Sequence, residues 1–95
     1  MPTARTRFET GQGAKYLAQL CKHFAHKTDA EWSGAEGRIN FPAGRAHLAA
    51  DAAGLAIRVE AEDEAGLDRL KGVVWSHLVR FAFREPEREP VWEAA

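Results

Sequence analysis

One segment of the chain, Tyr16-Leu-Ala-Gln-Leu-Cys-Lys-His-Phe-Ala-His-Lys27, repeats its apolar residues at the spacing of an amphipathic α-helix. His23 lies about 110° from the centre of the apolar stripe, and His26 lies nearly opposite it. The segment therefore predicts a helix that packs on a core and ends near Lys27 with two histidines close to its end. The residues of the apolar stripe are Leu17, Leu20, Cys21 and Phe24.

Alternation of apolar and polar residues predicts one strand before this helix and four strands after it. The first strand spans residues 3–9, and Thr10 behind it is expected to cap the helix. The later strands are expected at residues 28–32, 38–41, 45–50 and 55–61. Ser33, Gly34 and Gly37 are expected in the first turn between them. Connections this short join neighbouring antiparallel strands, so these four strands should form a meander.

A second amphipathic helix is predicted after the last of these strands, with Asp63 as its N-cap and Glu64 in its first turn. His77 lies about 60° from the centre of the apolar stripe of this helix. Arg84 shares that flank, and Arg80 lies further round. The residues of this second stripe are Leu67, Leu70, Val74, Leu78 and Phe81.

These elements predict an α+β fold with the order β-α-β-β-β-β-α and a final strand behind it. One antiparallel sheet with two helices packed on one face makes a two-layer sandwich, which explains why each strand has one apolar and one polar side. We expect a single domain over residues 1–95. Its core spans 1–84, a charged, proline-containing connector spans 85–90, and an edge strand or docked tail spans 91–95.

The composition is that of an ordinary globular domain, with 95 residues, 45% hydrophobic and 28% charged residues, and a net charge of −1. That net charge gives no general attraction to nucleic acid or to an anionic membrane. The single cysteine, Cys21, excludes an internal disulfide and suits a reducing compartment. No apolar run resembles a secretory signal or approaches the roughly 20 residues of a membrane span. We therefore predict a cytoplasmic protein without a membrane partner.

Three blocks of the sequence resemble one small bacterial family that is known only as domain of unknown function 2218. They are the helical segment quoted above, Ile39-Asn-Phe-Pro-Ala-Gly-Arg-Ala-His-Leu48 and His77-Leu-Val-Arg-Phe-Ala-Phe-Arg84. The resemblance covers nearly the whole chain and implies a compact α+β domain. It also implies a link to iron physiology, because similar domains occur attached to flavin-binding siderophore-interacting reductases. It implies no activity or catalytic residue, and the residues in its recognisable blocks are His23, His26, His77 and Arg80.

The histidines suggest a first candidate site, for a divalent metal ion. His23 and His26 are three residues apart on one helix and can share a face, but a catalytic zinc site needs a third protein ligand. His77 is the best candidate for that third ligand if its flank of the second helix meets His23, and a Glu or Asp from a loop is the other possibility. The alternative is that these are surface or capping histidines, because imidazolium and Lys27 suit the dipole at a helix C-terminus.

The second hypothesis for the same groove between the helices is an anion site. His77 and the two arginines near it can receive a carboxylate, a phosphate or a siderophore fragment. The alternative is that a backbone carbonyl satisfies His77, while Arg80 and Arg84 pair with Glu85 and Glu87. The ligand-binding residues of this hypothesis are His23, His26, His77, Arg80 and Arg84.

The outer face of the predicted sheet is basic. Some open sheets bind RNA, but they stack bases on aromatic residues of that face, whereas Phe8 and Phe41 are expected to point inward. The sequence therefore disfavours nucleic acid and favours self-association, for example as a homodimer, as the use of this face. Its basic residues are Arg5, Arg7, Arg38, Arg45, His47 and Arg58.

The sequence contains no arrangement that is typical of catalysis, such as a Ser-His-acid order, a nucleophile elbow or a carboxylate pair in an apolar setting. We therefore predict a non-enzymatic binding or accessory module. Its partner would be a small anionic ligand or a protein, such as a siderophore-related reductase. The alternative is a metal-dependent accessory protein or enzyme that uses His23, His26 and His77, with a divalent metal ion as its cofactor.

Overall fold

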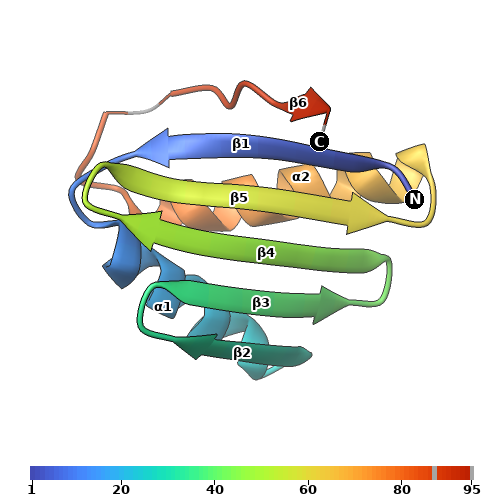
Figure 1. The fold of residues 1–95 in the computed structure, drawn as a ribbon, viewed down its shortest axis with the longest axis horizontal. Coiled ribbons are helices and arrows are strands. Elements are labelled where there is room, and N and C mark those ends of the chain that lie inside the picture. Colours follow the sequence, from blue (N-terminus) through green and yellow to red (C-terminus); the bar gives the residue numbers. More distant parts are fainter. Residues whose placement is uncertain (87, 95) are drawn as a thin grey trace.

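The computed structural model describes residues 1–86 and 88–94 and shows a six-stranded antiparallel sheet with both helices on one face (Figure 1). The sheet order is β2-β3-β4-β5-β1-β6. The predicted two-layer α+β fold is therefore confirmed. The strands are β1 (Thr3–Glu9), β2 (Asp29–Ser33), β3 (Glu36–Phe41), β4 (Gly44–Asp51), β5 (Gly54–Ala61) and β6 (Glu93–Ala94), and the helices are α1 (Gly13–Ala25) and α2 (Glu64–Phe81).

The strands β2 to β5 form the predicted meander, since each pairs antiparallel with the next. The strand β1 then pairs with β5, so that Thr3 lies opposite Glu60 and Glu9 lies opposite Gly54. Every second residue of these strands points toward the helices, and the burial of these side chains provides the main stabilisation of the fold. The largest fully buried side chains of the sheet are Phe8, Ile39, Leu55, Ile57 and Val59.

Both helices cover the sheet with the apolar stripes that the sequence predicts. In α1 the whole stripe is buried, together with Tyr16. In α2 the stripe is buried except for Phe81, which is half-buried, and Trp75 adds a large side chain to the core. Burial raises the pKa of the Cys21 thiol to about 11, so this residue acts as a small hydrophobic side chain.

Among the described residues, neither helix has the length and apolarity needed to cross a membrane.

The two helices begin in different ways. Asp63 caps α2 as predicted, since its Oδ1 accepts a hydrogen bond from the backbone N–H of Gly66 at 2.7 Å. The prediction that Thr10 caps α1 is wrong, because the N-cap is Gln12, whose side chain makes no capping hydrogen bond. The Thr10 hydroxyl accepts a hydrogen bond from the backbone N–H of Gln12 and donates one to Glu85. The hydroxyl of Thr10, the expected capping residue, is therefore hydrogen-bonded to the carboxylate of Glu85 near the C-terminal end of the chain.

The turn between β2 and β3 is tighter than predicted. Gly34 occupies it with a φ of 60°, a conformation that favours glycine. Gly37 is not part of this turn, because it lies within β3. A Cβ atom at Gly37 would come within 2.8 Å of the sulfur of Cys21. The missing side chain therefore lets α1 approach the sheet closely at this position.

A carboxylate ties the segment behind α2 to the start of the chain. Tyr16 and Thr10 donate hydrogen bonds to the same oxygen of Glu85, at 2.5 and 2.7 Å. The hydrogen bond from Tyr16 lowers the pKa of Glu85 most, and that from Thr10 lowers it further. The same hydrogen bond, with burial, raises the pKa of Tyr16 to about 12. We name these three residues the Glu85 cluster.

The segment after this cluster runs along the edge of β1 (Figure 1). Arg88 donates a hydrogen bond to the backbone carbonyl of Glu9 at 2.6 Å and stacks on the ring of Phe8, with its guanidinium carbon 4.1 Å from the ring centroid. The short strand β6 then pairs antiparallel with β1. Glu87, the other proposed partner of Arg80 and Arg84, lies outside the described residues, as does Ala95.

Candidate functional site

Two histidines meet where α1 packs beside α2. The ring centroids of His23 on α1 and His77 on α2 are 4.9 Å apart. The ring of Phe24 lies 5.0 Å from that of His23 and 4.9 Å from that of His77. Phe81 completes the group, at 5.9 Å from His23. We name these four residues the helix seam.

The ring nitrogens of the helix seam have different partners. His77 Nδ1 lies 2.7 Å from the backbone carbonyl of Val73, and since a carbonyl can only accept, Nδ1 carries a hydrogen. His23 Nε2 is buried and has no hydrogen-bond partner within residues 1–86 and 88–94. Gln19, one turn before His23, has its Oε1 buried in the same way. Buried polar atoms usually have partners, so within the described part of the chain these two atoms are unsatisfied polar atoms of the region beside the helix seam.

The charges that act on His23 are all positive. Burial lowers the pKa of this histidine most, and the nearby His77, Lys27, Arg80 and His26 lower it further. No carboxylate contributes to this shift among the described residues. Surroundings of one sign attract an ion of the opposite sign, so the charges acting on His23 among the described residues agree better with the anion hypothesis than with the metal hypothesis.

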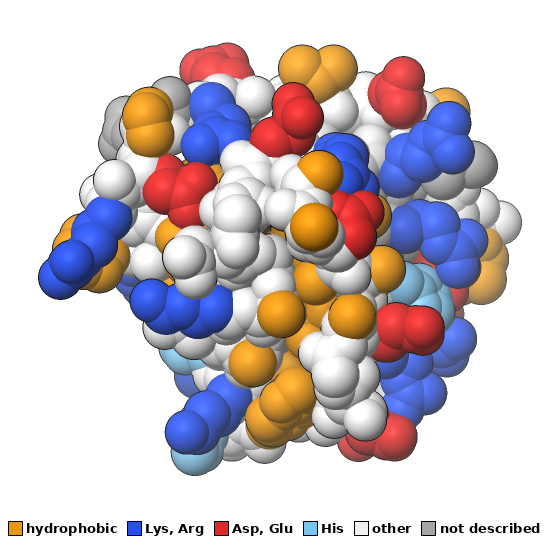
Figure 2. All heavy atoms as spheres, turned by 60° about the vertical axis from the view of Figure 1, so that its left-hand side comes forward, with side chains coloured by type: hydrophobic (Ala, Val, Ile, Leu, Met, Phe, Trp, Pro, Cys, Tyr) orange, Lys and Arg blue, Asp and Glu red, His pale blue; other side chains and the backbone are white. Residues whose placement is uncertain are grey.

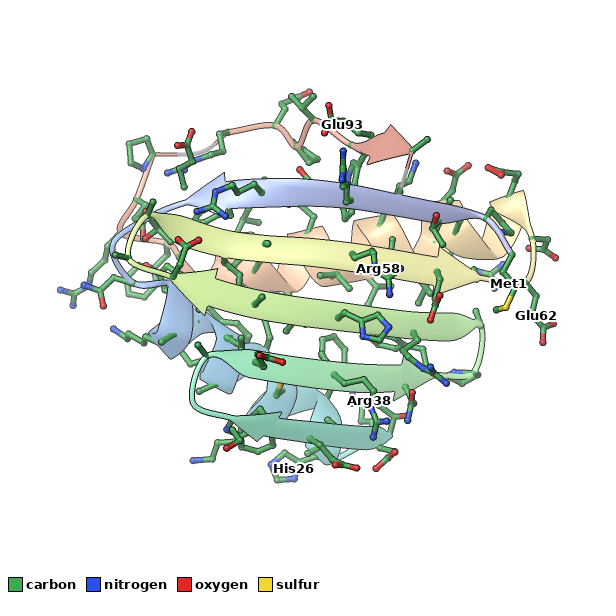
Figure 3. All side chains as sticks on the ribbon, viewed as in Figure 1. Met1, His26, Arg38, Arg58, Glu62 and Glu93 are labelled. Atoms are coloured by element: carbon green, nitrogen blue, oxygen red, sulfur yellow. The ribbon has the colours of Figure 1, made fainter. Side chains whose placement is uncertain are left out.

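The structure brings only part of the predicted site together. His26 is the C-cap of α1, is exposed, and lies at the lower edge of the molecule in the view of Figure 3. Arg80 is exposed and acts on His23 through its charge. Arg84 is also exposed, and its guanidinium carbon lies 5.5 Å from the ring centroid of Phe83. The helix seam therefore contains two of the three predicted histidines, with Arg80 at its side.

The metal hypothesis finds no set of three ligands. In the part of the chain that the structure describes, no three His, Cys, Asp or Glu side chains are grouped so that they could hold a metal ion. A backbone carbonyl satisfies one nitrogen of His77, as the alternative interpretation of that residue expects. Glu85 does not pair with Arg80 or Arg84, because its carboxylate belongs to the Glu85 cluster. Among the described residues, Arg80 and Arg84 therefore have no ion pair with Glu85.

The outer face of the sheet carries the basic residues that the sequence places there. Figure 2 shows Lys and Arg side chains gathered around a histidine along its right-hand side, toward which this face has turned. Most of them have acidic neighbours: Arg38 lies 2.7 Å from Glu31, and Arg7 lies 2.7 Å from Asp51. Arg58 differs, because its side chain makes no ion pair or hydrogen bond with any described residue. This face is therefore largely neutralised around one free guanidinium group.

The fold and the helix seam define a small two-layer α+β domain with a candidate anion site between its helices. The chain belongs to the family described as "Uncharacterized protein conserved in bacteria (DUF2218)", whose model matches residues 5–93. The resemblance seen in the sequence is therefore confirmed. The chain is also similar to the NMR structure of PA4090 from Pseudomonas aeruginosa, with 29% sequence identity and a TM-score of 0.83 over 98% of this chain and 96% of that chain. No curated protein matches the chain.

Proposed function

We propose that this domain is a non-enzymatic module that binds a small anionic ligand at the helix seam and takes up protons with it. The observation that carries the proposal is the state of His23. Its Nε2 is buried without a partner among the described residues, and every charge that acts on the ring is positive. A protonated imidazole is a charge-assisted donor to an oxyanion, so this ring can bind an anion once it gains a proton.

The other residues have distinct roles in this proposal. Arg80 and Lys27 supply positive charge that does not depend on histidine protonation. His77 can donate to a ligand from Nε2 only when protonated, because its Nδ1 hydrogen is bonded to Val73. Anion binding at the helix seam should therefore become stronger as the pH falls through the range in which imidazole takes up a proton.

The family resemblance supports a class of ligand. Related domains are linked by that resemblance to siderophore-interacting reductases, and siderophores bind iron through carboxylate, hydroxamate or catecholate groups. Carboxylates are among the oxyanions that arginine and imidazolium groups bind by charge-assisted hydrogen bonds, as phosphates are. We therefore propose an accessory role in iron metabolism, in which the module holds a carboxylate-bearing siderophore or a fragment of one.

Isothermal titration calorimetry with citrate, a tricarboxylate, tests this proposal. We expect tighter binding at about pH 5.5 than at about pH 7.5, with proton uptake that is visible as a dependence on the ionisation enthalpy of the buffer. The double variant His23→Phe/His77→Phe keeps aromatic rings at the helix seam and removes its titrating nitrogens. It should bind citrate at least about tenfold more weakly.

The exposed His26 provides a matched control, because His26→Gln removes a histidine of the same helix outside the helix seam. It should bind citrate within about twofold of the unchanged protein, because His26 is exposed and its charge acts on His23 less than those of His77, Lys27 and Arg80. Citrate affinity that stays the same in the double variant, or that does not change with pH, would contradict the proposal. A loss in His26→Gln as large as in the double variant would also contradict it.

A further inference from the structure

The open face of the sheet, on the other side from the helix seam, contains a hollow of about 810 Å³. Ala49 on β4 and Ala56 on β5 lie opposite each other in the register and form its floor. The nearest residues on the same face of the two strands, two positions away, are His47 on β4 and Arg58 on β5. Because the alanine side chains are much shorter than these two, they leave a depression. Small-molecule sites have volumes of roughly 300–1,000 Å³, and this sheet-face hollow lies within that range.

A row of basic side chains crosses the sheet beside this floor. Arg5 lies 3.7 Å from Glu93 at one end of the row. His47 lies 3.3 Å from Glu60 in its middle. Arg58, between Arg5 and His47, has no ion pair or hydrogen bond with a described residue, and its guanidinium group is free to bind a carboxylate through two parallel hydrogen bonds. From β1 to β3 the row consists of Arg5, Arg58, His47 and Arg38, of which Figure 3 labels Arg58 and Arg38.

The rest of the lining limits the ligand to an apolar body with a single negative charge. Val91, which is 77% exposed, lines the hollow together with the alanine floor, while Trp75 borders it from the core as a largely buried residue of α2. An aromatic ring would bury apolar surface against these groups. Three further arginines line the hollow, but each already has a partner: Arg5 contacts Glu93, Arg7 contacts Asp51, and Arg88 donates to the carbonyl of Glu9. Four carboxylates also line it and would repel a second negative charge, which disfavours nucleic acid and polycarboxylates. They are Glu9, Glu36, Glu89 and Glu93.

We infer that the sheet-face hollow binds a small aromatic monocarboxylate, with its carboxylate on Arg58 and its ring over Ala49 and Ala56. This site is independent of the helix seam, because the body of the sheet separates the two and they share no residue. It also differs in kind, since the charge that binds the ligand here is a permanent guanidinium charge that does not depend on pH.

Benzoate is the probe for this site, and NMR titration of the backbone amides of β4 and β5 measures its binding. Benzoate should bind at least about tenfold more tightly than acetate, which lacks the ring, or benzyl alcohol, which lacks the charge. Arg58→Gln should weaken benzoate binding by at least about tenfold, because it removes the free guanidinium group. Ala49→Leu should weaken it too, because the larger side chain fills the floor.

Arg45 offers a matched control on the same face, since it lies 3.7 Å from Glu60 and does not line the hollow. Arg45→Gln should bind benzoate like the unchanged protein. Benzoate affinity that is equal in Arg58→Gln and the unchanged protein, or equal for benzoate and acetate, would overturn the inference.

Sedimentation equilibrium without ligand should show a monomer. A dimer that dissociates in Arg58→Gln would assign this face to self-association and would also overturn the inference.

Discussion

The helix seam and the sheet-face hollow lie on opposite sides of one sheet, and they differ in how their positive charge is balanced. At the helix seam every charge that acts on His23 is basic, and the ring nitrogen beside them is buried. In the sheet-face hollow, Arg58 is the arginine without an ion pair or hydrogen bond to any described residue, in a lining that also contains four glutamates. If both proposals hold, a chain with a net charge of −1 has two anion sites of different selectivity. We expect the first to prefer a multiply charged anion and the second a singly charged one.

The largest expected effect compares the two sides of the sheet by how much a residue on each side contributes to the free energy of unfolding. Leu78 lies in α2, is fully buried, and faces the sheet on the same side as the helix seam. Leu78→Ala should lower the free energy of unfolding by about 2–5 kcal/mol, because it removes buried methyl groups and leaves a cavity. Arg58→Ala on the open face should change it by no more than about 0.5 kcal/mol. Urea unfolding of both variants measures the difference, and equal losses would contradict it.

A smaller effect concerns the Glu85 cluster. This cluster attaches the C-terminal segment, whose residues Arg88, Glu89 and Val91 line the sheet-face hollow, to Tyr16 of α1. Glu85→Gln should lower the free energy of unfolding by about 1–3 kcal/mol near pH 7, because two hydrogen bonds lose their charged acceptor. The folded-state pKa of Glu85 is lowered, so its contribution is present above the unfolded pKa and is lost as the pH falls through the folded pKa. The difference between variant and unchanged protein should therefore shrink between about pH 5 and pH 3.

The alkaline side of the same cluster gives a second check. The pKa of Tyr16 is raised from 10.0 to about 12 in the folded protein, so its contribution is complete below pH 10 and is lost as the pH rises toward 12. Tyr16→Phe should remove this alkaline loss of stability. Glu89→Gln, at an exposed position of the same segment, is the control and should keep both the acid and the alkaline behaviour. A control that behaves like Glu85→Gln would show that the cluster is not the cause.

The smallest effect should come from His23 at the helix seam. The pKa of His23 is lowered in the folded state, chiefly by burial, so the unfolded chain binds a proton more readily. The stability that follows is present above the unfolded pKa of about 6.5 and is lost as the pH falls below it. His23→Phe should therefore lose less stability than the unchanged protein between about pH 7 and pH 5, as measured by thermal unfolding at each pH. The same pH dependence in both proteins would show that His23 does not titrate in this way.

The fold was predictable because its signals are local. Strand alternation and helical periodicity gave the order of elements, the meander and the two buried stripes, and the structure confirms them. The errors arose where distant residues decide the outcome. Thr10 does not cap α1 because the helix begins only at Gly13, and the Thr10 hydroxyl is hydrogen-bonded to Glu85, 75 residues away in the sequence. Gly37 lies within β3 because it pairs with Trp32 and Leu48, and it has no side chain where Cys21 of α1 packs above it.

The candidate site was predictable only in part. Helical phase placed His23 and His77 on flanks that can meet, and the rings are 4.9 Å apart. The same phase places Gln19 on the solvent side of α1, although tertiary packing buries its Oε1. The sheet-face hollow depends on the register that sets Ala49 opposite Ala56 on neighbouring strands. Alternation places both alanines on the outer face, because a shift by one residue would move the apolar residues out of the core. A shift by two residues keeps that face, so the sequence alone does not fix that Ala49 pairs with Ala56.

The position of β1 has a consequence for the time at which the protein can fold. The strand β1 is synthesised before its pairing partner β5, which ends at Ala61. It therefore remains unpaired with β5 until Ala61 has left the ribosome. At about 5–20 residues per second, that interval lasts roughly 3–10 s. During this time Phe8 has no core in which to insert, and the nascent strand is accessible to chaperones or to an incorrect pairing. Closure of the sheet around β1 is therefore a late event in the synthesis of this domain.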